Sequence, residues 1–469
     1  MRWFVNPLIA FSALLYAGAF IVPVWCHWLV FLWLLPLFGY VCWYKEQPLH
    51  LYMLQGFWWG TIFFTLHMYA LIDMLAHYAC LVDAVLISFL LIGYCATISA
   101  CWFVCAALLT SGSSYRIRLV GWSCVTIIYI EFVQQLLFKI ICLPRGYVFA
   151  YPLVPLACCP AWLAGLIFLP QAVLVACLCV IAACLTYGII ETEYRYQAVL
   201  TAVLFFSPFL VGWCLPSRNS DRSYQATCIW VQPPSYNKDM VNVTPLAVAQ
   251  AINEQLYRAV HLNRQAVCIL FPESTFPFPL DLCDDVRDLW FENALFNLPE
   301  VTIIMGGHHS YDSAGRERKN TLFCLKQCRI MQTYDKNTYL PFAEYLPWPW
   351  KNSRFFSEFL LKNKKVFHQI DSQAIMLDIG SGIRMSPYIC SDLFFNYPRK
   401  DDVAPTIVWL VNDSWFCHYF RMLMFLHAQL QAHAYKRTIV YIAHTVGSCI
   451  EPYTKPYYLT AAMIPKNLN

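Results

Sequence analysis

The pattern of hydrophobic and polar positions divides the chain into two unlike parts. Up to about residue 215, long apolar stretches follow one another with only short polar interruptions. About 20 apolar residues in a helix cross a hydrocarbon core of about 30 Å, so these stretches predict membrane helices. The predicted spans are 4–24, 27–44, 52–75, 80–109, 119–138, a region within 152–188, and 197–215.

The region 152–188 allows two interpretations, because Pro155, Pro160 and Pro170 interrupt it. It is either two short spans, or an irregular entry followed by one helix over roughly 164–187. With one helix there, about seven spans form a bundle over residues 1–215. A cytoplasmic N-terminus then satisfies the positive-inside bias of the loops. This arrangement places the second part of the multi-pass chain outside, which is the periplasmic side of the bacterial inner membrane if the cell is a Gram-negative bacterium.

Beyond residue 215 the apolar segments become short and alternate with two helical candidates. Thr244 and Pro245 form a plausible N-cap and first position for the helix 244–262, and the second helix is 418–435. Mixed strands and helices over 216–469 predict one α/β or α+β domain. The predicted strands are 228–232, 266–271, 300–305, 321–325, 374–378, 386–390, 406–411 and 438–443.

Composition agrees with a membrane part followed by a water-soluble part. The 469 residues are 59% hydrophobic and 13% charged, against about 25% charged in soluble proteins. Only seven of the 32 Lys and Arg residues precede position 216. The net charge of +4 is small and dispersed, so we expect no nucleic-acid partner.

Cysteine is abundant, but its distribution does not indicate a disulfide scaffold or a metal site. Fourteen of the 22 cysteines lie in the apolar part, where they fit buried helices as small hydrophobic residues. Pairs such as Cys158-Cys159 lack the spacing and the partner histidines of a zinc site. We therefore expect neither a metal nor another cofactor.

Glu131 is a carboxylate within the predicted span 119–138. Such residues are costly in a bilayer and face the bundle interior or a polar cavity. It either belongs to a site that faces headgroups or substrate, or is a hydrogen-bonded residue near a helix end.

Three reactive side chains follow strand-like segments in the second part of the chain. Glu273 ends "AVCILFPE", Lys336 follows the segment "IMQTYD", and Cys390 ends "MSPYIC". Each alone is more often a loop glutamate, a solvated lysine or a core cysteine. Together in one cleft, the carboxylate can take the thiol proton, the ammonium can hold an oxyanion, and the thiol can be the nucleophile.

The sequence motifs around these residues resemble those of the nitrilase (carbon–nitrogen hydrolase) superfamily. More narrowly, they resemble its membrane-bound branch, the apolipoprotein N-acyltransferases. The segment with Lys336, followed by "LPFAEYLP", is the most specific of these motifs. The resemblance implies a multi-span helical bundle followed by an αββα sandwich domain. It is carried by "FPES" at 271–274, "YDKNTYLPFAEYLPW" at 334–348, "ICSDLFF" at 389–395 and "VNDSWF" at 411–416.

The same resemblance implies roles for four residues. Glu273 would be the general base, Lys336 the oxyanion stabiliser, Cys390 the nucleophile, and Glu344 the residue that orients Lys336. The implied reaction is ping-pong acyl transfer. A phospholipid gives its acyl group to Cys390 as a thioester, and the N-terminal amine of a diacylglyceryl apolipoprotein then accepts it. We expect the enzyme to act as a monomer.

Further residues are candidates for substrate contact. Trp348 belongs to an apolar lip or to the core, and Trp415 and Phe416 line an acyl pocket or pack in the core. Ser391 and Asp392 stand where the family commonly has an aromatic residue and a glutamate. Asp392 keeps the charge on a shorter arm, so we place it among the substrate-binding residues and expect the departures to affect substrate choice.

Two alternatives to the acyltransferase stay open on the sequence. The first keeps the same residues but uses water or another acceptor, as a membrane-anchored amidase or a specialised acyltransferase. The second is a non-catalytic assembly or transport protein that has kept the fold. The family normally continues into one more membrane helix after the point where this chain ends at Asn469, so we expect the C-terminus to lie outside. The pair His308-His309 predicts a surface turn.

Overall fold

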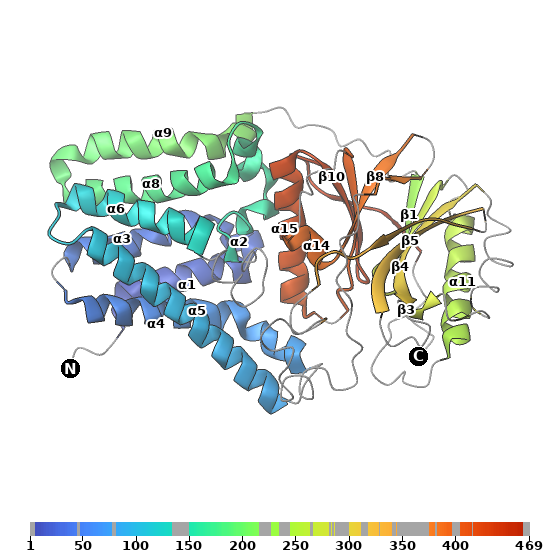
Figure 1. Cartoon of the computed structure of the whole chain (residues 1–469). Helices are drawn as coiled ribbons and strands as arrows, with labels where there is room; N and C mark the ends of the chain where they lie inside the picture. The colour runs from blue at the N-terminus through green and yellow to red at the C-terminus, as the bar shows by residue number, and fades with distance from the viewer. Residues whose placement is uncertain are drawn as a thin grey trace. The chain divides into compact units, whose positions relative to one another are not determined.

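The computed structural model of the 469-residue chain divides into two compact units, one helical and one of mixed helix and sheet (Figure 1). The helical unit comprises Met1–Arg218 and Phe416–Ala434, and the α/β unit comprises Asn219–Trp415 and Tyr435–Asn469. The structure describes residues 5–44, 47–76, 81–133, 150–214, 227–233, 244–262, 266–280, 283, 286, 300–310, 318–327, 329–339, 344, 375–379, 382–395, 404–414 and 416–462.

Each predicted span contains helical structure. Asn6 caps the first helix, because its side chain accepts a hydrogen bond from the Leu8 amide at 3.0 Å. The α-helices of this unit are α1 (Pro7–Ile21), α2 (Pro23–Cys26), α3 (Leu34–Trp43), α4 (Leu49–Ala76), α5 (Leu81–Leu109), α6 (Tyr115–Ile128), α8 (Gln171–Ile190), α9 (Arg195–Cys214) and α15 (His418–Tyr435). A π-helical turn, η2 (Tyr129–Val133), extends α6.

In the region 152–188, an irregular entry leads into one helix, as the second of the two interpretations predicts. Two 3₁₀ segments, η4 (Pro155–Cys158) and η5 (Pro160–Ile167), precede the single helix α8. Each of these three elements begins at or just after a proline. Proline has no N–H to donate, so it is tolerated in the first turn of a helix and breaks a longer one.

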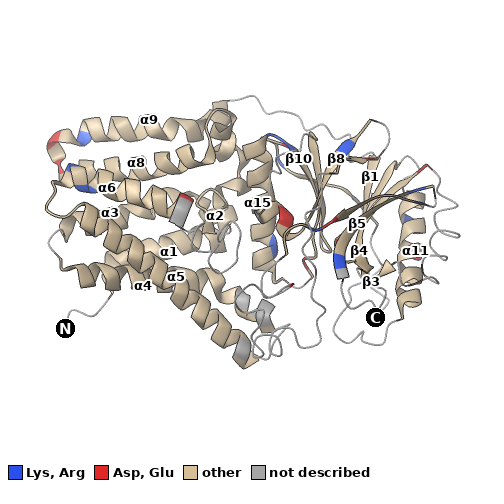
Figure 2. Cartoon of the chain, in the orientation of Figure 1, with Lys and Arg blue, Asp and Glu red and all other residues tan. Residues whose placement is uncertain are grey.

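Several helices suit a membrane environment. Within the described residues, four stretches are long and apolar enough to cross a bilayer: Pro23–Trp43, Ala84–Leu109, Gln171–Ile190 and Thr192–Cys214. Each of them exposes apolar side chains, such as Trp43 (62%), Phe89 (73%), Ile189 (60%) and Leu204 (63%). Figure 2 shows few charged residues along these helices. Contiguous exposed apolar surface of this kind marks a surface that is covered by lipid or by protein.

The α/β unit contains two mixed β-sheets. In the first, the order is β13-β1-β2-β4-β5-β6, with β3 paired to β4. Strands β1, β2 and β4 run parallel, whereas β5 is antiparallel to both β4 and β6. The strands are β1 (Cys228–Val231), β2 (Cys268–Leu270), β3 (Phe276–Pro279), β4 (Thr302–Ser310), β5 (Arg318–Lys326), β6 (Arg329–Asp335) and β13 (Thr460–Ala462).

The second sheet has the order β12-β11-β10-β9-β8-β7. Strands β8, β9 and β10 are parallel, so their carboxyl ends share one edge. The strands are β7 (Leu377–Asp378), β8 (Arg384–Ile389), β9 (Thr406–Leu410), β10 (Thr438–Ile442), β11 (Gly447–Ile450) and β12 (Tyr457–Tyr458). The short helix α14 (Ser391–Phe395) begins directly after Cys390, the one residue that separates it from β8.

One hydrophobic core joins the two sheets face to face. It unites side chains from the first sheet, such as Leu270 and Ile304, with side chains from the second, such as Leu410 and Ile442. A second core fills the other face of the first sheet, where the apolar side of α11 (Pro245–Leu262) packs. The predicted fold class, an apolar multi-helix region followed by an α/β domain with two packed sheets, is confirmed.

Local predictions vary in accuracy. Helix α11 begins at Pro245 as expected, and the Thr244 hydroxyl oxygen accepts a hydrogen bond from the Ala247 amide at 3.3 Å. The surface turn at His308-His309 is wrong, because both residues continue β4 and pair with Asn320 and Lys319 of β5. The antiparallel partner makes this segment a strand although its sequence contains two glycines and two histidines.

Candidate active site

Glu273 lies in a tight turn just after β2. The turn begins at Pro272, whose carbonyl oxygen accepts hydrogen bonds from the Gly306 amide and the Thr275 hydroxyl. Ser274 adopts a φ of 56°, a conformation that is uncommon outside glycine and polar turn residues. Gly306 of β4 passes so close that a Cβ there would lie 2.6 Å from the Glu273 Cα. A glycine at 306 therefore lets the turn press against β4.

The Glu273 carboxylate is buried and held by three donors. Its Oε1 accepts from the Asn320 side-chain amide at 2.6 Å and from Lys336 Nζ at 3.2 Å. Its Oε2 accepts from the Asn412 backbone amide at 2.7 Å. His444 Nε2 lies 2.8 Å from the Glu273 carbonyl oxygen and can donate to it. Donors on both oxygens fix the orientation of the carboxylate.

Lys336 follows β6 directly and is 1% exposed. Its Nζ lies 2.7 Å from Glu344 Oε1 and 3.2 Å from Glu273 Oε1. Burial by itself lowers the pKa of the ammonium, but the two carboxylates and the nearby Cys390 outweigh it and hold the pKa well above the ordinary lysine value. Lys336 therefore stays charged.

Cys390 lies at a sharp bend between β8 and α14. Its φ is 41°, in the left-handed region that costs an L-residue about 1–2 kcal/mol. Two hydrogen bonds hold the bend: the Cys390 amide donates to the Leu410 carbonyl at 2.8 Å, and Trp409 Nε1 donates to the Cys390 carbonyl at 2.9 Å. Cys390 as a residue is partly buried, so the bend does not enclose it completely.

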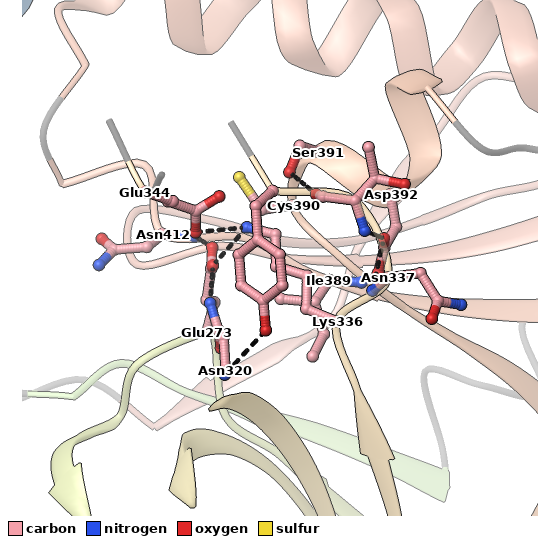
Figure 3. A network of polar contacts seen from close by, with 12 residues as sticks. Glu273, Asn320, Lys336, Asn337, Glu344, Ile389, Cys390, Ser391, Asp392 and Asn412 are labelled. Carbon is pink, nitrogen blue, oxygen red and sulfur yellow. Dashed lines mark hydrogen bonds and ion pairs between the residues drawn. The ribbon is translucent and has the colours of Figure 1, made fainter. Parts of the chain in front are cut away.

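The protonation of Cys390 follows from its neighbours. Burial and the negative charge of Glu273 raise the pKa of the thiol well above its ordinary value, and Lys336 opposes this only in part. The resting group is therefore a thiol with a carboxylate beside it. Figure 3 shows Cys390 between two groups of contacts, one around Glu273 and Glu344 and the other around Asp392.

Asp392 is fully buried and has no contact left for a substrate. Its Oδ1 accepts from the backbone amides of Asn337 and Thr338 at 3.1 and 2.7 Å. Its Oδ2 accepts from the Tyr334 hydroxyl at 2.9 Å and the Ile389 amide at 3.2 Å. Burial raises the pKa of Asp392, while Lys336 and these donors oppose the rise.

These contacts correct the role predicted for Asp392 as a substrate-binding residue. Its four donors belong to the segment around Lys336 and to the end of β8, so the carboxylate joins the segment that carries the lysine to the strand that carries the thiol. The neighbouring Ser391 is also buried, and its hydroxyl donates to the Thr338 carbonyl. Both departures from the family pattern therefore point into the protein.

The arrangement supports nucleophilic chemistry at a carbonyl carbon. The Cys390 amide is occupied by Leu410, so it does not serve as an oxyanion donor. Lysine has three N–H donors, and Lys336 uses two of them on Glu273 and Glu344. The third can stabilise the negative charge that develops on a carbonyl oxygen attacked by the thiol.

Comparison with known proteins agrees with the family resemblance of the sequence motifs. The chain is similar to an apolipoprotein N-acyltransferase. That protein, from Aquifex aeolicus (strain VF5), is 22% identical over 240 residues, which are 51% of this chain and 46% of that protein. The chain thus spans about half the length of the curated relative it matches. The predicted resemblance is confirmed.

Solved structures similar to the chain include an amidase and a synthetase. An amidase of the nitrilase superfamily from Nesterenkonia has 15% sequence identity and a TM-score of 0.34, over 46% of this chain and 81% of that one. A glutamine-dependent NAD⁺ synthetase from Acinetobacter baumannii has 16% identity and a TM-score of 0.32, over 45% of this chain and 40% of that one. No family model matches the chain.

The structure brings Glu273, Lys336, Glu344 and Cys390 together, but not every predicted residue can be placed. Trp348 and Trp415 lie outside the described residues. Phe416 belongs to the helical unit, where its ring centroid is 6.2 Å from that of Phe420, and its part in an acyl pocket stays a prediction.

The predicted intramembrane carboxylate, Glu131, is hydrogen-bonded as one of its two interpretations requires. It lies in η2 and accepts a hydrogen bond from the Tyr151 hydroxyl at 2.6 Å.

Three residues of the site escaped sequence reasoning. Asn320 precedes the most apolar part of β5, Asn412 follows β9, and His444 follows β10. Asn412 and His444 stand at the carboxyl ends of strands parallel to β8, so the position of Cys390 could have indicated them. The contribution of Asn412 to Glu273 comes from its backbone amide, which no residue type reveals.

Proposed function

We propose that the chain is a membrane-anchored acyltransferase with Cys390 as its nucleophile. It moves a fatty acyl group from a phospholipid to the N-terminal amine of a diacylglyceryl-cysteine apolipoprotein. The α/β unit works on the periplasmic side of a bacterial inner membrane. The observation that carries the proposal is the buried cluster of Glu273, Lys336 and Glu344 beside Cys390, in a chain whose described part includes four helices apolar enough to span a bilayer.

In the first half-reaction, Cys390 attacks the ester carbonyl of the phospholipid. Its proton passes to Glu273, the Sγ–C bond forms, and the charge that develops on the carbonyl oxygen faces the remaining N–H of Lys336. When the ester C–O bond breaks, Glu273 returns the proton to the leaving oxygen. The products are a thioester on Cys390 and a lysophospholipid.

In the second half-reaction, the amine of the apolipoprotein attacks the thioester. Glu273 takes a proton from the amine nitrogen and passes it to Cys390 Sγ as the C–S bond breaks. An amide and the free thiol result, and no cofactor or metal is needed for the balance. Lys336 stabilises the second oxyanion as it did the first, since Glu344 keeps its Nζ in place at 2.7 Å.

A two-stage transfer experiment tests the proposal. Purified full-length protein is incubated with a phospholipid that carries a labelled acyl chain, freed of excess lipid, and then chased with buffer or with a diacylglyceryl lipopeptide. We expect the label to move to the lipopeptide in a hydroxylamine-stable form. Cys390→Ala should give no labelled protein, whereas Cys283→Ala, which alters a half-buried cysteine packed against the other core of the α/β unit, should behave as wild type.

The chase separates the candidate functions. Label that leaves with the lipopeptide but persists in buffer supports the N-acyltransferase. Label that is lost equally fast to water identifies a hydrolase with the same nucleophile. If folded wild-type protein never acquires label, both enzyme functions are wrong and a non-catalytic role gains support.

A further inference from the structure

A small cavity lies at one end of the helical unit, where three helices begin or end. Gln47 and Tyr52 line it from the start of α4, Thr110 and Ser111 from the segment after α5, and Arg118 from the first turn of α6. Its volume is about 140 Å³, which is room for about four or five waters at about 30 Å³ each. A cavity of this size fits one small ion and is too small for an acyl chain.

The Arg118 side chain is buried in the wall of this cavity. It is 3% exposed, and its hydrogen bond is a long one, 3.4 Å from Nη1 to the Val41 carbonyl oxygen. The buried Nε has no partner. Among the residues that the structure describes, no carboxylate forms an ion pair with it. A buried guanidinium without a negative partner is unfavourable unless an anion joins it.

Arg116, two residues earlier on the same helix, shows the contrast. Its Nε donates to the Tyr187 hydroxyl at 2.6 Å, and its guanidinium stacks 4.5 Å from the centre of the Tyr194 ring. Arg116 is exposed, so solvent and these aromatic groups accommodate its charge. Arg118 is buried instead and lines the cavity together with Tyr52.

The other lining groups are suited to a negative ligand. The Gln47 carbonyl already accepts a hydrogen bond from the Tyr40 hydroxyl at 2.8 Å, which leaves its amide N–H groups to donate. The Tyr52 hydroxyl donates to the Tyr44 carbonyl. Among the described residues that line the cavity there is no aspartate or glutamate. The planar guanidinium and the amide of Gln47 together match the oxygens of a tetrahedral anion.

We propose that this cavity, the Arg118 pocket, binds a single phosphate-class oxyanion. It lies at the end of the candidate span Ala84–Leu109, where Ala107 and Leu108 line it together with Thr110 and Ser111, and so near the depth where the headgroups of a bilayer begin. A phospholipid headgroup is therefore the expected source, with free inorganic phosphate as the other source of the same chemistry. The pocket does not depend on acyl transfer, because it uses none of the residues around Cys390.

The test measures the thermal unfolding midpoint of delipidated full-length protein in neutral detergent. One arm titrates phosphatidylglycerol, a second titrates inorganic phosphate, and a third titrates a phosphate-free glycosyl diacylglycerol. We expect phosphatidylglycerol to raise the midpoint by at least about 2 °C and the glycolipid to leave it unchanged. Arg118→Gln should raise the half-saturating concentration of phosphatidylglycerol by about tenfold or more. Arg116→Gln, the matched loss of charge, should respond as wild type.

Gln47→Glu covers the case in which Arg118→Gln does not fold. The carboxylate keeps the acceptor for Tyr40 and gives Arg118 a built-in counter-ion. We therefore expect a higher midpoint before any addition and no further rise with phosphatidylglycerol.

A rise with inorganic phosphate alone, lost in Gln47→Glu, supports the oxyanion site with free phosphate as its source. No rise with either source, or a rise that Gln47→Glu leaves intact, overturns the proposal.

Discussion

Gly306 is the position where a single methyl group should displace the proposed catalytic base. A Cβ at this position would lie 2.6 Å from the Glu273 Cα, 2.9 Å from the Pro272 carbonyl oxygen and 2.9 Å from the Ser274 amide nitrogen. All three are backbone atoms, so none can rotate away. Ordinary contact begins at 3.4 Å, so Gly306→Ala must move the turn by about 0.8 Å.

That movement should affect activity more than stability. Overpacking of this kind costs about 1–3 kcal/mol of unfolding free energy. The hydrogen bonds to the Glu273 carboxylate are 2.6 and 2.7 Å long, and a displacement near 1 Å at a reacting group costs about 100-fold in rate. We expect the rate of acyl-enzyme formation at Cys390 to fall by about 10- to 100-fold while the protein still folds.

The neighbouring glycine provides the control. A Cβ at Gly307 would lie 3.2 Å from Phe323 Cε2, which is the far end of a side chain and can give way. Single-turnover acylation and the thermal midpoint are measured for both alanine variants. Gly307→Ala should keep near wild-type acylation. Equal rates in the two variants, or a loss of folding without a selective loss of rate, would refute the reasoning about the turn.

Other substitutions and pH address the remaining parts of the site. Lys336→Met leaves two buried carboxylates unpaired, so it should destabilise the protein by about 3–5 kcal/mol in thermal unfolding and slow acylation by about 100-fold or more. Asp392→Asn places an amide N–H donor among the four donors that now contact the carboxylate, so it should lower the free energy of unfolding by about 1–3 kcal/mol and slow acylation. Asp378→Asn, at the exposed end of β7, should change neither quantity. Burial and Glu273 raise the pKa of Cys390 above the ordinary 9.0, so the folded state favours the thiol. The stability that the protonated thiol contributes is present below pH 9.0 and is lost as the pH rises further. The rate of iodoacetamide labelling of Cys390 should therefore still be increasing above pH 9.0. A rate that reaches its plateau at neutral pH would contradict this.

The sequence predicted the large elements because their signals are local. The predicted helices 244–262 and 418–435 agree with α11 (Pro245–Leu262) and α15 (His418–Tyr435) to within one residue. The helical period of apolar residues and the capping residues are both determined by residues that are close in the sequence. Strands β11 to β13 were missed because they have two to four residues and depend on distant partners. The strand at His308 was missed for the same reason.

The candidate site was predicted in its reactive groups but not in its supports. Glu273, Lys336 and Cys390 stood out because each follows a strand-like segment, and the resemblance of the flanking motifs to the nitrilase superfamily then implied their roles. The links that hold them are long-range and partly backbone, such as the Asn412 amide on Glu273 across 139 positions. Asp392 was placed on the substrate side because nothing local reveals that four donors surround it.

The central claim is that Cys390 carries the acyl group, and the most direct test is the mass of its peptide. Full-length protein is mixed with a phospholipid of known acyl composition, quenched in acid and digested, and the peptide with Cys390 is analysed with and without hydroxylamine. The account predicts an added mass equal to one fatty acyl group, removed by hydroxylamine and absent in Glu273→Gln. An unmodified Cys390 peptide from folded protein that has produced lysophospholipid would contradict it.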